Sequence, residues 1–528
     1  MKQVLNGKFK FVVVGGGTAG WIAALYVKRY FTDTQVTVIE SSEMGVIGVG
    51  ESTTPHIINM LGELNIDIGE FIKNTQSTIK NSIKFTNWHG DNKHYYHSFA
   101  QQSNVDWHSS NLPNCIPPMG TLEHIISDKT DSLLKIDFTA LACEQNKVRF
   151  SFKQPNEINN TSTAMQHFNV HGAYAIHIDA ILMSRFLKQI GISRGIKVID
   201  GIVEKINNNN KGNIESFELK NVKKPVPCNF VFDCTGLNRL IIGKHFKTEW
   251  RSYKEYLPVN GAISFTQYMD PNKDIPPYTE CIAMKYGWMW KIPLQHRYGC
   301  GYVFDKNYIN SEEAIKEVED LLKSKINVDK RFSFEAGAHE TIWVKNCIAV
   351  GLANGFIEPL ESTSIMNSIQ ILNTFLQHIN GLIENDKREI DLFNTTTNDI
   401  ANAILTFVCF HYHTKRADTD FWKKITKNYK TLGLLEKLIN NNKDISYVHN
   451  NYLRNEKLSI FPPYSWDQVG IGLKFYDKEK AAKLFDAYNL GKRKTDYENL
   501  KTNLKNRLGQ ILPNIVSHRM FLNYILSR

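Results

Sequence analysis

The stretch FVVVGGGTAG, residues 11–20, is the strongest local indication of fold in this chain. Its first four residues are apolar and predict a buried strand, and the apolar run WIAALYV directly after the stretch predicts a helix. Gly15, Gly17 and Gly20 keep the spacing G-x-G-x-x-G. In that spacing the first glycine permits a tight turn, the second lets the backbone approach a pyrophosphate, and the third lets the helix pack closely on the strand. The stretch therefore predicts a dinucleotide-binding turn.

A second strand completes the unit. The segment QVTVIE, residues 35–40, predicts a strand that ends at Glu40, twenty residues beyond Gly20. An acidic side chain at this place can accept hydrogen bonds from ribose hydroxyls. Thr18 and Ala19 open the helix, whose first N–H groups and partial positive charge favour phosphate oxygens. The strand–helix–strand pattern predicts a Rossmann-type module for either FAD or NAD.

A strand in mid-chain favours FAD over NAD. The segment FVFDCTG, residues 230–236, predicts a strand that ends at Asp233 and runs into a glycine turn. Such a second element is typical of FAD-dependent monooxygenase-like folds, which use it to close over the cofactor. The alternative for Asp233 is a structural one, in which its carboxylate caps the turn or a following helix.

Other segments predict how the rest of the chain is organised. Residues 171–187 predict a short strand, an N-cap at Asp179 and a helix. Two strand-like segments flank NNNNKGN, residues 207–213, and predict a hairpin. A long helix is expected to begin near Ser364, and the pattern from about residue 367 to 528 is mostly helical.

Composition describes an ordinary globular protein. The 528 residues are 42% hydrophobic and 22% charged, and their number predicts two to four domain-sized units. No run of 18 apolar residues is present, so no transmembrane helix is expected. The eight cysteines show neither CxxC nor metal-ligand spacing, and no secretory signal precedes them. We therefore expect free thiols, a cytoplasmic location and no metal site.

The net charge of +10 leaves several partners open. A solvated surface rich in Asn and Lys explains it without any function, whereas an anionic cofactor, an anionic partner or nucleic acid would use it. No basic stripe with interleaved aromatic residues and no nucleic-acid-binding motif stands out. The sequence thus predicts no nucleic-acid partner.

Several motifs together carry a family resemblance. The segments are GVGESTTP (48–55), TIKNSIKFTNW (78–88), GWMWKIP (287–293) and GLANGFIEPLESTSI (351–365). Together with GGGTAG they resemble the flavin-dependent halogenases of the tryptophan-halogenase type. The resemblance continues through YYHSFA, FHYHTKRADTDFW and FPPYSW, so that it spans nearly the whole chain.

The resemblance implies a mixed α/β chain with a FAD-dependent monooxygenase-like fold. Residues 1–366 are expected to form a discontinuous FAD-binding module with a Rossmann-type core and a substrate-facing insert at about 78–120. Residues 367–528 are expected to form a mostly helical layer that completes the substrate site.

The resemblance also implies a two-site reaction in which reduced FAD, oxygen and halide give hypohalous acid. That oxidant travels inside the protein to an aromatic substrate. Lys80 matches the family's catalytic lysine, which holds the oxidant by a hydrogen bond or as a haloamine. The chemistry agrees, because an electrophilic halogen needs a donor that polarises it and a fixed position. Lys84, four residues later, is expected to be an ordinary solvated lysine.

Glu361 matches the second catalytic residue of the family. Electrophilic substitution leaves a cationic ring that must lose a proton, and a carboxylate can stabilise that cation and accept the proton. A capping or paired structural glutamate is the alternative. The resemblance further assigns halide-binding backbone groups and flavin contacts, which are Thr363 and Ser364 for the halide and Ser52, Val203, Leu352 and Ile365 for the flavin.

The resemblance places substrate and oxidant between aromatic residues. His97 and Phe99 match the aromatic platform on which the substrate ring stacks, and plain core packing is the alternative. Trp288 and Trp290 alternate along one predicted strand and therefore face one way. In the family this segment walls the passage near the flavin; by themselves, two such tryptophans would be ordinary core.

The implied partners follow from the same chemistry. A small aromatic compound such as an indole or a phenol is expected as substrate, free or carrier-bound. Because no second dinucleotide fingerprint is visible, a separate NAD(P)H-dependent flavin reductase is expected to supply reduced FAD. A homodimer stays open. Two other functions compete: a FAD-dependent aromatic monooxygenase and a non-catalytic flavin-binding protein.

Overall fold

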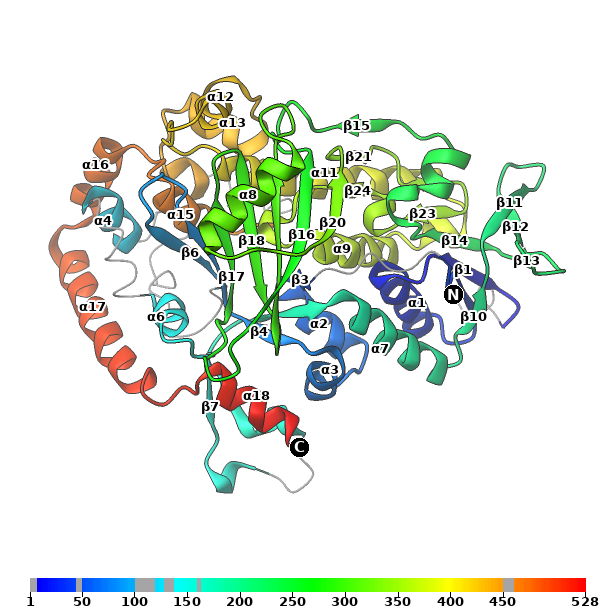
Figure 1. Cartoon of the computed structure of the whole chain (residues 1–528), viewed down its shortest axis with the longest axis horizontal. Helices are drawn as coiled ribbons and strands as arrows, with labels where there is room; N and C mark the ends of the chain where they lie inside the picture. Colours follow the sequence, from blue (N-terminus) through cyan, green and yellow to red (C-terminus); the bar gives the residue numbers. More distant parts are fainter. Residues whose placement is uncertain (1–6, 44–49, 100–118, 128–136, 159–162, 450–459) are drawn as a thin grey trace. The chain divides into compact units, whose positions relative to one another are not determined.

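The computed structural model describes residues 7–43, 50–99, 119–127, 137–158, 163–449 and 460–528 (Figure 1). The chain divides into two compact units. Unit 1 contains residues 1–76, 178–254 and 335–401, and unit 2 contains residues 77–177, 255–334 and 402–528. Each unit is therefore assembled from three separate stretches of sequence.

A six-stranded sheet forms the centre of unit 1. The strands lie in the order β10 (Lys197–Asp200), β2 (Gln35–Glu40), β1 (Lys10–Val14), β14 (Phe230–Asp233), β23 (Cys347–Ala349) and β22 (Trp343–Val344). All neighbours pair in parallel except β22 and β23. The predicted strand–helix–strand unit is confirmed as β1, α1 (Thr18–Tyr30) and β2.

The two faces of this sheet are covered differently. Phe11 pairs with Phe230, and Phe375 of α9 (Ser364–Gln377) stacks on Phe230 with ring centroids 5.5 Å apart. Val12 and Val231 point to the opposite face, into a separate apolar cluster. That cluster includes residues of β11 (Val203–Asn208), β12 (Ile214–Leu219) and β13 (Val226–Pro227). The sheet is therefore buried on both sides, as its nearly continuous apolar strands require.

The predicted hairpin and helix starts are confirmed. Strands β11 and β12 pair antiparallel around NNNNKGN. Asp179 ends β9 (Ala175–Asp179) and caps α7 (Ala180–Ser193) by accepting hydrogen bonds from the first N–H groups of the helix. Helix α9 begins at Ser364. The other elements of unit 1 are β3 (Gly50–Ser52), α2 (His56–Glu63), α3 (Ile68–Thr75), β15 (Trp250–Ser252), β21 (Gly337–His339), β24 (Gly355–Phe356) and α10 (Asn380–Ile383).

A seven-stranded sheet forms the centre of unit 2. Its order is β20 (Val328–Ser333), β16 (Gly261–Tyr268), β19 (Arg297–Phe304), β18 (Gly287–Pro293), β17 (Tyr278–Ala283), β5 (Ser82–Thr86) and β6 (His94–Ser98). Only β17 and β5 pair in parallel. Strand β4 (Thr78–Lys80) precedes β5 but pairs with β9 instead.

The register of this sheet sorts its side chains onto two faces. Trp290 pairs with Cys281 and Gly301, and Cys281 pairs with Phe85, so these residues share one face. Met289 and Tyr302 belong to the other face, where they form an apolar cluster with residues of α8 (Ser311–Leu322). The tryptophan-bearing face is thus the one that α8 leaves free for other elements.

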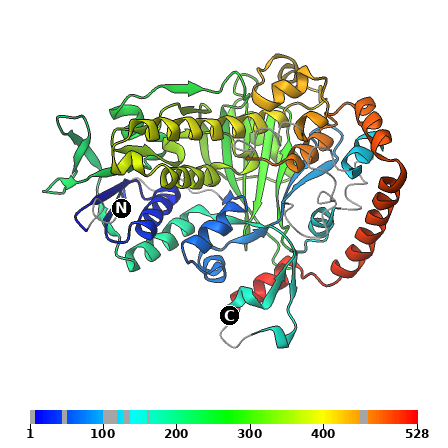
Figure 2. The same cartoon turned by 180° about the vertical axis from the view of Figure 1, so that it is seen from behind.

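The C-terminal part of the chain is mostly helical, as the sequence predicts. Helix α11 (Lys387–His411) is uninterrupted and is the long yellow helix of Figure 2. The remaining helices, which lie wholly in unit 2, are α4 (Met119–Ser127), α6 (Phe138–Glu144), α12 (Asp420–Asn428), α13 (Gly433–Asn440), α15 (Pro463–Gly472), α16 (Lys478–Tyr488), α17 (Gly491–Ile511) and α18 (His518–Leu526). A short antiparallel pair, β7 (Phe150–Phe152) and β8 (Phe168–Val170), completes the unit.

The compact units do not coincide with the predicted division at residue 366. That position lies inside α9, which belongs wholly to unit 1. The predicted insert at about 78–120 contributes β4, β5 and β6 to unit 2, and its residues 100–118 lie outside the described residues. The division into a flavin module and a substrate layer therefore stays a prediction.

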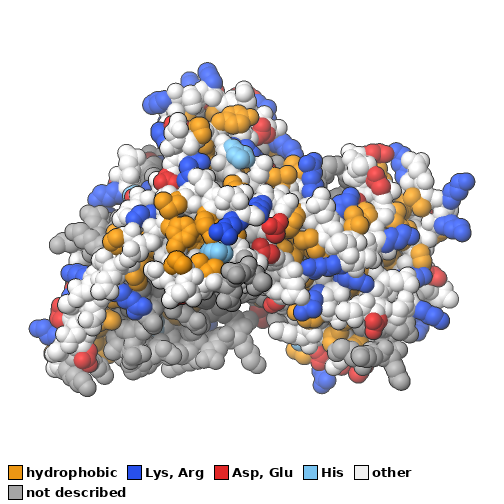
Figure 3. Space-filling model, turned by 90° about the horizontal axis from the view of Figure 1, so that it is seen from below, with side chains coloured by type: hydrophobic (Ala, Val, Ile, Leu, Met, Phe, Trp, Pro, Cys, Tyr) orange, Lys and Arg blue, Asp and Glu red, His pale blue; other side chains and the backbone are white. Residues whose placement is uncertain are grey.

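Basic residues are numerous but dispersed on the face shown in Figure 3. Lys and Arg side chains lie there among acidic and uncharged ones, without forming one continuous stripe. Within the described part of the chain, no helix is both long and apolar enough to cross a membrane. The same residues contain no group of three or more His, Cys, Asp and Glu side chains that could hold a metal ion.

Candidate active site

The glycine turn of unit 1 leaves space for a ligand at one position. A side chain at Gly15 or Gly20 would collide with backbone, because the added Cβ would lie 2.1 Å from the Cys234 carbonyl oxygen or 1.9 Å from that of Gly15. A Cβ at Gly17 would meet nothing within 4 Å. Gly17 is also the N-cap of α1, so the free N–H groups of the helix begin at this open position. The turn fits the phosphate cradle that the sequence predicts.

Two neighbours of the turn add detail that the motif did not contain. A Cβ at Gly16 would lie 2.1 Å from Oε2 of Glu40, although the pattern allows any residue there. Glu40 ends β2 as predicted, and its carboxylate forms an ion pair with Lys188 of α7. A ribose that binds Glu40 would therefore share the carboxylate with Lys188.

Asp233 uses its carboxylate within the fold. Oδ1 accepts hydrogen bonds from the N–H and hydroxyl of Thr235, and Oδ2 accepts from the N–H groups of Ile241 and Ile242. These four bonds fix the turn after β14, so Asp233 has the structural capping role that is the alternative to a cofactor contact. Contact of Asp233 with FAD stays a prediction.

The turn after β23 lies close to the start of α1. A Cβ at Gly351 would be 2.6 Å from Cβ of Ala19, and Gly351 adopts a φ of +70° that favours glycine. Leu352 follows it in a short 3-10 turn. The sequence-predicted flavin contacts Ala19 and Leu352 are thus brought to one place. Val203 begins β11 and Ser52 ends β3, and their contact with a flavin is untested.

Glu361 and the predicted halide residues form one continuous segment. Glu361 is 1% exposed and lies one turn before α9. Thr363 is the N-cap of α9 but its hydroxyl does not cap the helix, so it leaves the first N–H groups available to another acceptor. Ser364 and Ile365 are the first two residues of this fourteen-residue helix. A helix N-terminus of this kind suits an anion such as halide.

A titratable carboxylate stands beside predicted flavin contact Ser52. Burial, together with the Asp179 carboxylate, raises the pKa of Glu51 to about 7. Glu51 occupies the middle of β3, in the GVGESTTP motif. A protonated acid and a carboxylate are therefore both accessible to this side chain near neutral pH.

Lys80 ends β4 and is fully buried in unit 2. Its Nζ lies 4.9 Å from the centroid of the Phe99 ring, within the range of a cation–π contact. Burial and the Lys80 ammonium lower the pKa of His177 well below its usual range. The imidazole of His177 contacts the hydroxyls of Thr78 and Thr279 instead of carrying charge. The structure thus brings Lys80 and Phe99 together, as the prediction requires.

The strand that carries Lys80 is fixed from the far end of the chain. The Ile79 N–H donates to Nε2 of His518, 2.9 Å away, and Nδ1 of His518 donates to the Ile275 carbonyl. Burial lowers the pKa of His518 to about 3, so this imidazole stays neutral and can accept. No local motif predicts this pairing, because α18 lies far from β4 in the sequence.

Phe99 is held through its backbone. Its N–H donates to the Asn81 carbonyl at 3.0 Å, and its carbonyl accepts from the fully buried guanidinium of Arg149 at 2.8 Å. Arg149 also donates to the hydroxyl of Thr139. Arg149 is a residue that the sequence reasoning missed, since nothing near it in sequence marks it as a support for the substrate platform.

Three family motifs meet in one aromatic cluster. The ring of His97 lies 5.6 Å from Phe407 of α11, and Phe407 stacks on Phe461 with centroids 3.9 Å apart. Trp466 of α15 contacts Phe407 edge to face and stacks on Phe410. His97 is therefore part of an aromatic cluster to which the motifs YYHSFA, FHYHTKRADTDFW and FPPYSW all contribute.

Trp288 and Trp290 share one face of β18, as predicted. Their ring centroids lie 6.2 Å apart at 61°, an edge-to-face arrangement, and their side chains are 0% and 8% exposed respectively. A Cβ at Gly301 would lie 2.1 Å from the Trp290 ring, so the indole lies flat against a strand that has no side chain there. The pair forms a rigid aromatic wall, and its place beside an oxidant passage stays a prediction.

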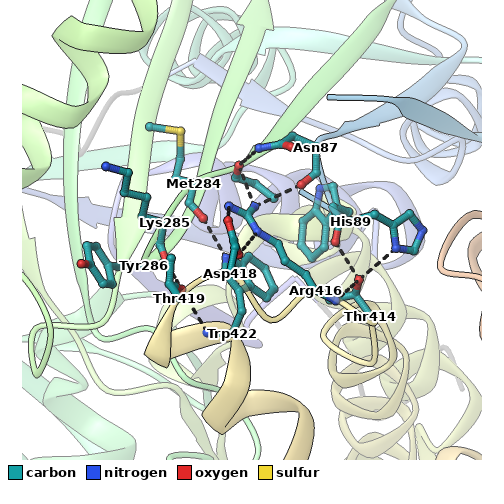
Figure 4. Close-up of polar contacts among 12 residues, drawn as sticks. Asn87, His89, Met284, Lys285, Tyr286, Thr414, Arg416, Asp418, Thr419 and Trp422 are labelled. Atoms are coloured by element: carbon teal, nitrogen blue, oxygen red, sulfur yellow. Dashed lines mark hydrogen bonds and ion pairs between the residues drawn. The ribbon is translucent and has the colours of Figure 1, made fainter. Parts of the chain in front are cut away.

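The hairpin before this wall is tied down by one arginine (Figure 4). Arg416 donates to both carboxylate oxygens of Asp418, and its Nη1 donates to the carbonyls of Asn87 and Ala283. Trp422 adds a bond from its indole N–H to the Met284 carbonyl. The motif FHYHTKRADTDFW thus positions the loops that lead into β18.

The family model of tryptophan halogenases matches residues 10–488. The chain is 29% identical over 447 residues to the 7-chloro-L-tryptophan 6-halogenase KtzR of Kutzneria sp. (strain 744), with 81% of this chain and 84% of that one covered. It is 28% identical over 462 residues to the tryptophan 7-halogenase RebH of Lentzea aerocolonigenes, with 82% of each covered.

Solved structures agree in fold. The tryptophan 6-halogenase SttH of Streptomyces toxytricini superposes with a TM-score of 0.84 at 25% identity, covering 98% of this chain and 100% of that one. The flavin-dependent halogenase BrvH of Brevundimonas sp. BAL3 gives 0.81 at 24% identity, with 98% and 100% covered, and supports the fold alone.

Fold and motifs define an enzyme of the flavin-dependent halogenase class. The chain belongs to the tryptophan halogenase family. The family resemblance and the mixed α/β fold expected from the sequence are both confirmed.

Proposed function

We propose that the protein halogenates a small aromatic substrate, which is an indole, a phenol or a similar ring. The Lys80 amine would hold the halogenating oxidant. The observation that carries this proposal is a fully buried lysine whose amine lies 4.9 Å from the Phe99 ring centroid, in a chain of the tryptophan halogenase family. Lysines are rarely fully buried, and buried titratable side chains gather at functional sites, which favours a chemical role.

Unit 1 offers residues that fit FAD. The open position at Gly17 and the start of α1 would hold the pyrophosphate, and Glu40 would bind the ribose. Ser52 and Leu352 would contact the flavin. Reduced FAD supplies the two electrons that, with oxygen, let halide become hypohalous acid. The first N–H groups of α9, at Ser364 and Ile365, would hold the halide.

Lys80 would fix the oxidant against the substrate ring. In hypohalous acid the halogen is electrophilic, and a hydrogen bond from the ammonium to the oxygen makes the oxygen a better leaving group. The ring carbon then forms a bond to halogen while the halogen–oxygen bond breaks, and the oxygen leaves as water after it gains a proton. His97 and Phe99 would keep the ring in place by stacking.

Glu361 would complete the substitution. The ring becomes cationic when it gains the halogen and must lose one proton to regain aromaticity. A buried carboxylate stabilises the cation and accepts that proton, which balances the proton used to release water. This role rests on the match of EPLEST to the family motif.

Replacing Lys80 tests the proposal directly. With bromide, a separate flavin reductase, NADH and FAD, the wild-type protein should convert indole or phenol to a product that carries bromine, detected by mass spectrometry. Lys80→Ala should lower this rate at least about 100-fold, the size of effect seen when one oriented donor is removed. FAD binding, followed by flavin fluorescence, should stay unchanged.

Lys84→Ala is the matched control. Lys84 lies in the same motif, but its amine contacts the rings of Tyr96 and Tyr278 and has no proposed chemical role. This variant should keep most of the bromination rate. Bromination by Lys80→Ala at the wild-type rate would refute the proposal, and a hydroxylated product from the wild type would favour a monooxygenase instead.

A further inference from the structure

Asn81 is a buried amide next to the proposed catalytic lysine. It is 0% exposed, and neither Nδ2 nor Oδ1 finds a hydrogen-bond partner among the described residues. An unpaired buried amide is costly, and such groups in native proteins usually pair with an ordered water or a ligand. The side chain is therefore poised for a partner that is not part of the chain as described.

The backbone of Asn81 fixes where its side chain lies. Its N–H donates to the Pro277 carbonyl at 2.7 Å, and its carbonyl accepts from the Phe99 N–H at 3.0 Å. The backbone of Asn81 is therefore held between Pro277, which precedes β17, and Phe99, which follows β6. Asn81 is the single residue between β4 and β5, and it directly follows Lys80.

Candidate substrate residues lie close to Asn81. The Phe99 N–H donates to the Asn81 carbonyl, and His97 pairs with Ile83, two residues beyond Asn81. The Lys80 amine also reaches the Phe99 ring. An amide without a side-chain partner, the Lys80 amine and Phe99 thus come together where β4 passes into β5.

We propose that Asn81 orients the aromatic substrate, its Oδ1 accepting a hydrogen bond from a ring N–H or O–H. This inference rests on the proposed function and narrows it to rings that carry a hydrogen-bond donor. One fixed hydrogen bond on a stacked ring removes its freedom to rotate in the stacking plane. Asn81 would thereby decide which ring carbon faces Lys80.

A binding experiment separates this role from a structural one. Indole and benzofuran have nearly the same shape, but benzofuran lacks the N–H. Calorimetric titration of the purified protein should show that indole binds about five- to tenfold more tightly than benzofuran, the range that one hydrogen bond supplies. In Asn81→Leu the two compounds should bind equally, because leucine fills the space without accepting.

Ser82→Ala is the matched control. Its hydroxyl donates to the His97 carbonyl, so the change removes a polar group from the adjacent position that already has a partner. This variant should keep the wild-type preference for indole. Thermal unfolding checks that both variants fold: Asn81→Leu should not lower the melting temperature, since it removes an unsatisfied amide.

The remaining outcomes decide against the proposal. Equal binding of indole and benzofuran to the wild type would mean that Asn81 holds only an ordered water. A preference that survives in Asn81→Leu would assign it to another residue. Parallel bromination assays of the wild type keep the two questions apart, because a binding preference without bromination would count against the proposed function and not against Asn81.

Discussion

Glu51 is the residue whose raised pKa makes unit 1 sensitive to pH. The pKa of an unperturbed glutamate is about 4.3, whereas burial raises that of Glu51 to about 7. Between these values the folded protein holds a proton that the unfolded chain has released. Stability contributed by this group is therefore complete at pH 4 and declines as the pH rises towards 7, after which it is constant.

Glu51→Gln should remove this decline. The wild type should lose about 1–3 kcal/mol relative to the variant between pH 5 and pH 8, which is 1.36 kcal/mol per unit of pKa shift, discounted for partial exposure. Urea unfolding of FAD-free protein at the two pH values measures the difference. The exposed Glu70 on α3 supplies the control. In Glu70→Gln the free energy of unfolding should change between the two pH values by the same amount as in the wild type. The same result for Glu51→Gln would contradict the raised pKa of Glu51 as the cause of this pH dependence.

Among the elements, the loop between α11 and α12 supports the hairpin that leads into β18. Arg416 is 4% exposed and joins Asn87, at the end of β5, to Ala283, at the end of β17. Its partner Asp418 is 49% exposed, so the ion pair alone contributes little. Most of the cost of removing Arg416 would come from its two bonds to carbonyls, although the Ala283 carbonyl keeps a second donor in Nδ2 of Asn87.

Arg416→Ala should destabilise unit 2 by about 1–3 kcal/mol. Arg416→Lys should fall between the wild type and Arg416→Ala, because an ammonium cannot reproduce the planar fork. Lys415→Ala, a change at the exposed neighbouring position, should stay within about 0.5 kcal/mol of the wild type. Urea unfolding followed by tryptophan fluorescence measures all three, and equal midpoints for Arg416→Ala and Lys415→Ala would show that the network contributes nothing.

Helix α18 illustrates a second kind of support. His518 accepts from Ile79 only while its imidazole is neutral, and a pKa of about 3 keeps it so across the physiological range. The strand that ends at Lys80 is thus held by a group whose charge does not vary with pH near neutrality. The C-terminal helix therefore contributes to the position of the proposed catalytic amine.

At the scale of the whole molecule, the chain is expected to depend on a reductase. Its sequence has one dinucleotide fingerprint, at Gly15–Gly20, and nothing comparable for a nicotinamide cofactor. NADH, FAD, oxygen and bromide without a reductase should give no brominated product. Addition of a flavin reductase, or of chemically reduced FAD, should start the reaction. Turnover with NADH alone would show that the chain reduces its own flavin.

Much of unit 1 could be predicted because its signals are local. The strand and helix on either side of the glycine turn, the Asp179 cap and the start of α9 at Ser364 each depend on a few adjacent residues, and the structure confirms all three. The fold class followed from motifs spread along the chain. Gly16 could not be predicted from the pattern, since its constraint comes from Glu40 on another strand.

The supports of the candidate site could not be predicted, because their partners are remote in sequence. Arg416 donates to Asn87 across 329 positions, and Ile79 donates to His518 across 439. Periodicity and spacing carry no trace of such pairs. Asn81 was equally hidden, since its significance depends on burial without a partner, and only three-dimensional packing reveals that.

The edge-to-face contact of Trp288 and Trp290 has an optical consequence. Two indoles whose centroids lie 6.2 Å apart at 61° are close enough, and sufficiently non-parallel, for their ultraviolet transitions to couple. Coupled transitions give a circular dichroism couplet, two bands of opposite sign that an isolated indole does not produce. The wall thus contains its own chromophore, and the couplet should change in amplitude whenever a ligand moves either ring.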